Sequence, residues 1–111
     1  MFWGKIMIYT TTETVPGKEI EAVLGIVNGN MVQSKHVGRD IMAGLKGIVG
    51  GELKGYTEML MEARNVAVER LIEDAKKLNA DAIVGIRFTT SSVTDGASEI
   101  LVFGTAVKLR T

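Results

Sequence analysis

Residues 55–79 read GYTEMLMEARNVAVERLIEDAKKLN, and this stretch decides the fold of the chain. At about 100° per residue on a helical wheel, its polar side chains fall on one narrow stripe, formed by Glu58, Glu62, Asn65, Glu69, Glu73 and Lys76. Apolar side chains occupy about two-thirds of the circumference, whereas a helix on a single core needs a stripe of only about 100°. The pattern therefore predicts a long helix that packs on two sides.

Two extended segments after this helix are predicted to form a β-hairpin. Residues 82–93 and 99–109 are rich in β-branched side chains, and Asp95-Gly96 between them is a turn signal. Apolar residues do not alternate here but run together, as in Ile100-Leu101-Val102-Phe103. Such runs are typical of strands covered on both faces, while one helix layer covers only one face. A symmetric copy of the chain is the simplest second cover.

The first third of the chain favours two further strands. Residues 6–11 and 20–32 have extended-type composition, and Pro16-Gly17 marks a turn between them. Asn28-Gly29 interrupts the second strand. This dipeptide fits either a hairpin turn or a glycine bulge within one long strand, and the sequence leaves both interpretations open.

A shorter helix is predicted between the two halves. Residues 39–49 change to helical periodicity, and Gly50-Gly51 ends the helix. The order strand, strand, helix, long helix, strand, strand predicts an α+β domain of two layers. In it, an antiparallel sheet packs against one long and one shorter helix.

Composition excludes several classes of protein. The 111 residues include 13 basic and 13 acidic side chains, so the chain lacks the cationic surplus of a nucleic-acid binder. It has no cysteine, and 46% of its residues are hydrophobic, which is high for so small a domain. No apolar run approaches the roughly 18–20 residues of a membrane span, and no secretory signal begins the chain. We expect a cytoplasmic protein that covers part of its apolar surface with another copy of itself.

Candidate chemistry is sparse. His36 is the sole histidine, and one histidine without cysteine cannot complete a transition-metal site within one chain. We interpret His36 as a loop residue and a weak metal candidate, which would need copies from several subunits. The acidic stripe of the long helix is interpreted as a solvated face, because no Glu-x-x-His motif accompanies it. The sequence assigns no catalytic residue and no cofactor.

Arg64 is more informative, because it falls inside the apolar arc of the long helix. An unpaired guanidinium is costly there, so we expect a structural or intersubunit partner or, less favoured, a bound anion. Asp40, Glu52 and Asp81 are the candidate partners. Gly50-Gly51 precedes the helix but matches no nucleotide-binding spacing. The candidate ligand-binding residues are therefore Arg64, Asp40, Gly50 and Gly51.

Several motifs together resemble the central signature of the YbjQ-like family. They are Ile48-Val49-Gly50-Gly51, then Tyr56, Leu60, Ala63-Arg64 and Ala67, with Ala80-Asp81-Ala82-Ile83-Val84-Gly85 and Gly104-Thr105-Ala106-Val107. The similarity covers about residues 7–109. We interpret residues 1–6 as an N-terminal extension and residues 7–111 as one YbjQ-like domain.

The resemblance implies a dodecin-like subunit that assembles as a homopentameric ring. Members of the family are prokaryotic, mostly uncharacterised, and usually labelled "putative heavy-metal-binding". No catalytic residues are established for the family, so none is carried over. We therefore hypothesise a non-enzymatic oligomer that binds a small ligand or ion or serves as a scaffold. The alternatives are a metal-binding protein with ligands from several subunits and, ranked last, an enzyme with a site between subunits.

Overall fold

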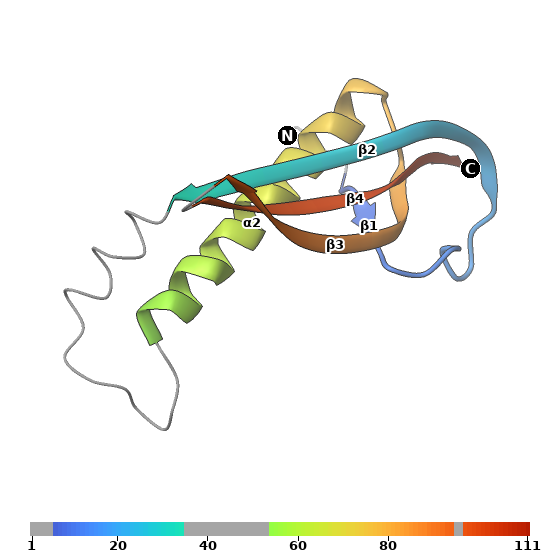
Figure 1. Cartoon of the computed structure of the whole chain (residues 1–111). Coiled ribbons are helices and arrows are strands. Elements are labelled where there is room, and N and C mark those ends of the chain that lie inside the picture. Colours follow the sequence, from blue (N-terminus) through green and yellow to red (C-terminus); the bar gives the residue numbers. More distant parts are fainter. Residues whose placement is uncertain (1–5, 35–53, 95–96) are drawn as a thin grey trace, which may run out of the picture.

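The computed structural model describes residues 6–34, 54–94 and 97–111. Its strands are β1 (Ile8–Tyr9), β2 (Ile20–Ser34), β3 (Ala82–Thr94) and β4 (Ala97–Leu109), and its helix is α2 (Lys54–Lys77). The strands form one four-stranded sheet in the order β1-β3-β4-β2, and α2 lies across one face of it (Figure 1). The α+β class, the long helix and the C-terminal hairpin are confirmed. The shorter helix predicted at residues 39–49 lies outside the described residues.

The sheet is mixed rather than antiparallel, which corrects the sequence prediction. β1 pairs in parallel with β3, while β3 and β2 pair antiparallel with β4. Beyond Tyr9 the pairing continues as single hydrogen bonds, from Thr10 N to Ile83 O at 3.0 Å and from Ile86 N to Thr10 O at 3.1 Å. Composition and periodicity do not encode the direction in which a short edge strand is added, so this feature could not be predicted.

β2 is one continuous strand through Asn28-Gly29. Asn28 lies opposite Phe103 and Gly29 opposite Val102 in an uninterrupted register, so neither the hairpin turn nor the bulge occurs there. The irregularities lie earlier, between Ile20 and Ala22 and between Val23 and Gly25. A glycine is needed at position 29 for another reason. A Cβ atom there would collide with Ala67 O and Leu71 N of α2.

The main core lies between α2 and the sheet. Four fully buried residues, each one turn apart, form the face of α2 that touches the sheet: Ala63, Ala67, Leu71 and Ala75. Three of the four are alanines, and they bring the helix axis close to the strands. Against them pack Val27, Ile83, Ile86, Ile100, Val102 and Ala106.

A smaller core covers part of the opposite face of the sheet. Val15, from the segment between β1 and β2, packs there against Ala82, Val84, Val107 and Leu109. One end of the hairpin is therefore buried on both faces by its own chain. The sequence predicts a symmetric copy as the simplest second cover, whereas at this end a loop of the same chain supplies it.

Gly29→Ala is predicted to lower the free energy of unfolding by about 2–3 kcal/mol. The added methyl group meets main-chain atoms of α2, which cannot rotate away as a side chain can, so the helix must shift. Urea denaturation measures the change. Asn28→Ala is the matched control, because Asn28 is exposed and its main-chain contacts remain. We expect the control within about 0.5 kcal/mol of the wild type. Equal midpoints for the two variants would contradict the close approach.

Candidate functional site

The position of α2 on the sheet creates the candidate sites. The helix packs mainly on β2, less on β4 and least on β3. It therefore lies off-centre, above one side of the four-stranded sheet. Residues two positions apart on a helix point about 200° apart, so Val66 and Val68 mark opposite flanks of α2. Each flank borders a cavity.

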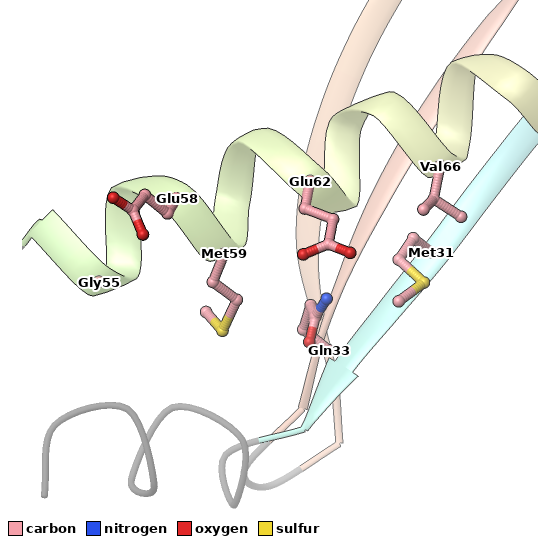
Figure 2. Close-up of a pocket in the computed structure, with 7 residues that line it drawn as sticks. All are labelled: Met31, Gln33, Gly55, Glu58, Met59, Glu62 and Val66. Atoms are coloured by element: carbon pink, nitrogen blue, oxygen red, sulfur yellow. The ribbon is translucent and has the colours of Figure 1, made fainter. Parts of the chain in front are cut away.

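The first cavity, of about 390 Å³, opens between the N-terminal half of α2 and the end of β2. Its lining combines two carboxylates, two thioethers and one amide, from Met31, Gln33, Glu58, Met59 and Glu62, with Gly55 and Val66. Figure 2 shows Met59 and Glu62 projecting from α2 toward the end of β2, where Gln33 lies. Both carboxylates belong to exposed residues. The cavity can therefore accept a cation, or a polar group of another molecule.

The second cavity, of about 220 Å³, lies on the other flank, above β3. Its lining is mainly apolar and consists of Tyr9, Thr10, Thr11, Val68, Leu71, Ile86 and Phe88. Gly85, at φ +63, belongs to an irregularity between Val84 and Arg87, and Ile86 beyond it is buried in the main core. Phe88 remains 49% exposed, because α2 does not extend over this strand.

Beyond the small core, the sheet face away from α2 carries exposed apolar side chains among polar ones, which include Asn28 and the hydrogen-bonded pair Asn30 and Glu99. Ile26 is 79% exposed, Val32 51% and Phe103 38%. Asn28 lies opposite Phe103, so these two side chains share one face of the sheet. Ile26 and Val32 lie two and four residues from Asn28, so their side chains point to the same face. We call Ile26, Val32 and Phe103 the open face.

The outer edge of β2 is closed by side chains of α2. Asp74 Oδ2 accepts a hydrogen bond from Asn28 N at 3.0 Å, and Arg70 Nη1 donates one to Asn30 O at 2.6 Å. Asp74 and Arg70 are one helical turn apart, and Asn28 and Asn30 are two residues apart on the strand. The helix therefore occupies main-chain groups that an added strand would otherwise use.

Of the predicted site residues, the structure describes only Arg64. Its side chain is exposed, and it forms no ion pair with another described residue. Asp81, one expected partner, instead lies 3.8 Å from Lys108 Nζ and accepts a hydrogen bond from Leu109 N at 2.8 Å. Asp40, Gly50, Gly51, Glu52 and His36 lie outside the described residues. The structure therefore brings no two of the predicted ligand-binding residues together.

The acidic stripe of α2 stays on the surface. Glu58, Glu62, Glu69 and Glu73 are exposed, and Glu73 lies 3.6 Å from Lys76. Across residues 6–34, 54–94 and 97–111, no group of three or more His, Cys, Asp or Glu side chains is arranged to hold a metal ion. In the same part of the chain, no helix is long and apolar enough to cross a bilayer.

Sequence reasoning missed the edge-closing pair and both cavities. Arg70 and Asp74 look like ordinary charged surface residues on a helical wheel. Their i, i+4 spacing is a weak signal, because it equally suits a solvated face. Only the placement of α2 above the β2 edge gives these residues their role.

These features define the class: an α+β domain in which a long helix crosses a mixed sheet off-centre and leaves apolar surface uncovered. The YbjQ family model, described as "putative heavy-metal-binding", matches residues 7–110. The chain belongs to this family, which confirms the resemblance drawn from its motifs.

Relatives named UPF0145 protein cover nearly the whole chain. The protein from Vibrio campbellii is 71% identical over 103 residues, which span 93% of this chain and 99% of the relative. The one from Thermotoga maritima is 59% identical over 103 residues, or 93% of this chain and 97% of the relative. A solved structure from Pediococcus pentosaceus, a DUF74 family protein of unknown function, matches with a TM-score of 0.63. At 18% identity over 94% of this chain and 98% of that chain, it supports the fold alone.

Asp74→Ala is predicted to lower the free energy of unfolding by about 1 kcal/mol, because Asn28 N loses its acceptor. Glu73→Ala is the matched control. It removes a carboxylate from the same turn, and its exposed pair with Lys76 contributes little. Hydrogen exchange at the Asn28 amide is a second readout and should accelerate only in Asp74→Ala. Equal stability and equal exchange in the two variants would show that the contact does not close the edge.

Proposed function

We propose that this protein is a non-enzymatic homo-oligomer, a homopentameric dodecin-like ring as the family resemblance implies. It acts as a scaffold or as a binder of a small ligand or ion. The observation that carries the proposal is the open face, where Ile26, Val32 and Phe103 stay between 38% and 79% exposed in the single chain. Burying an aliphatic or aromatic side chain of this size contributes about 1.5–3 kcal/mol. Several large apolar side chains exposed on one sheet face support an association surface.

The helix supports the same proposal. Its sequence has an apolar arc wider than one sheet can cover, and the sheet buries only the stripe from Ala63 to Ala75. Leu60 and Met61 remain 44% and 51% exposed. A helix packed on two sides needs a second surface, and a further copy of the chain offers one.

Ile26→Glu is predicted to raise the dissociation constant of the assembly at least tenfold. Losing one buried isoleucine alone costs roughly 1.5–3 kcal/mol, and each 1.4 kcal/mol is a factor of ten. Light scattering coupled to size-exclusion chromatography, over a dilution series, measures the mass. Ile26→Val keeps the surface apolar and should assemble like the wild type. Because Ile26 is exposed in the single chain, neither variant should unfold it. A wild-type monomer at micromolar concentration would refute the proposal.

A second candidate function is the binding of a soft metal ion, and one observation favours it. Met31 and Met59 line the same cavity as Glu58 and Glu62, and Arg70 Nη1 lies 3.8 Å from Met31 Sδ, which a bound metal ion would have to displace. Thioethers select soft ions such as Cu(I). A search for histidine and cysteine ligands alone would not find these donors.

Calorimetric titration with zinc, copper, nickel and cadmium ions tests this candidate, with copper as Cu(I) under anaerobic conditions. Replacing both methionines, Met31→Leu with Met59→Leu, should weaken Cu(I) binding at least tenfold while keeping the apolar volume. The pair Glu58→Gln with Glu62→Gln separates the carboxylate contribution, and His36→Ala tests the histidine. If the wild type releases no heat with any of these ions, the candidate is removed.

A further inference from the structure

The outer edge of β3 is open over part of its length. The last main-chain hydrogen bond from the β1 side reaches Ile86 N, and Arg87 Nη1 donates to Ile86 O at 2.8 Å. Main-chain groups that point outward recur at every second residue of a strand. Those of Phe88 and Thr90 therefore point away from β4, and no described residue pairs with them.

The outer edge of β2 is closed in its middle and open at its end. Arg70 and Asp74 occupy main-chain groups of Asn28 and Asn30, as described above. Val32 is the next residue of β2 whose main-chain groups point outward, and neither of these two contacts involves it. Among residues 6–34, 54–94 and 97–111, the sheet thus has two different stretches of edge without a main-chain partner, at Phe88–Thr90 and at Val32.

The two stretches lie at the same end of the sheet and run in the same direction. Ser92 of β3 and Gln33 of β2 both lie opposite Ser98 of β4. Both strands are antiparallel to β4, so they are parallel to each other. We propose that the open edge of β3 pairs in parallel with the end of β2 from a second copy of this chain. This contact rests on the self-assembly proposed above.

The pleat of the strands agrees with a parallel pairing. In a parallel ladder, a residue whose main-chain groups point toward the partner strand lies beside a partner residue whose main-chain groups point away. Thr90 would therefore lie beside Met31 or Gln33, the residues on either side of Val32. Thr90 and Met31 both lie opposite Ile100, so their side chains share the face covered by α2. An antiparallel ladder would instead place Thr90 beside Val32, which points to the other face. A continuous sheet with all helices on one side therefore requires the parallel arrangement.

Apolar surface and charge fit the same contact. The off-centre helix of the second copy, above its own β2, would approach the uncovered cavity beside Phe88. Arg64 precedes Val68 by one turn and so lies on the flank above β3. Glu62 lines the cavity on the opposite flank, at the end of β2. Joining the two edges brings an arginine flank toward a glutamate flank, so Glu62 of the second copy would be a partner for Arg64. It differs from the partners named from the sequence, which are Asp40, Glu52 and Asp81.

Two different edges that join head to tail form a heterologous contact, and such contacts close into a ring where the rotation between neighbours closes on itself. The same contact repeated around an axis keeps every β2 end and every β3 edge occupied. Edge pairing thus supplies a geometric reason for a cyclic assembly, independent of the apolar open face.

Cross-linking tests the contact, and the absence of native cysteine makes the background clean. A chain carrying Thr90→Cys and Gln33→Cys should give, after mild oxidation, a ladder of covalent oligomers that ends at the subunit number. Neighbouring strands lie about 4.8 Å apart, within the Cα separation of roughly 4.4–6.8 Å that a disulfide accepts. Thr90→Cys with Glu21→Cys is the matched control. Glu21 is exposed at the far end of β2 and should give no ladder.

Hydrogen exchange of the wild-type protein is a second readout that needs no substitution. In the assembly, the Phe88 and Thr90 amides should exchange at least tenfold more slowly than in the wild-type protein diluted until light scattering gives the mass of a single chain. A wild-type monomer by light scattering would refute the self-assembly itself. An oligomer without the ladder and with fast exchange at these amides would overturn only the edge pairing. Covalent dimers from Thr90→Cys alone would also overturn it, because they would show β3 pairing with β3.

Discussion

The fold depends on the close approach of two main chains, that of β2 at Gly29 and that of α2 at Ala67 and Leu71. A glycine on the strand and a stripe of alanines on the helix remove the side chains that normally hold these layers about 10 Å apart. The helix is thereby fixed above β2 and β4 rather than above the middle of the sheet. Both cavities and the closed part of the β2 edge follow from this placement.

The off-centre helix makes the two sides of the molecule unequal. Above β2 it comes near enough for Arg70 and Asp74 to occupy the main-chain groups of the strand. Above β3 it is too far away to cover Phe88, and a mainly apolar cavity remains. Natural proteins protect exposed strand edges because an unpaired edge recruits other strands. In the proposed assembly, closing one part of the sheet edge and leaving another open would direct association to a defined place.

The family description names heavy-metal binding, whereas the described residues mainly present apolar surface suited to association. No cluster of three or more His, Cys, Asp or Glu side chains exists in the described segments. The carboxylates of Glu58 and Glu62 share a cavity with methionine sulfurs instead. Meanwhile the loop residue Val15 covers only one end of the sheet face away from α2, and Ile26 and Phe103 stay uncovered. Assembly therefore has the firmer physical basis, and a metal site would be built on the same subunit.

The sequence by itself determined the long helix, the two paired strands near the C-terminus and the excess of apolar surface, because these are encoded in local periodicity and composition, while the predicted Asp95-Gly96 turn lies outside the described residues. It also identified the family through its motifs. Only the tertiary structure decided that β1 is parallel to β3, that Gly29 is a packing contact, and that Arg70 and Asp74 close an edge. These features join residues up to 74 positions apart in the chain. Their energy comes from contacts between elements, and such contacts leave no periodic signal in the sequence of either partner.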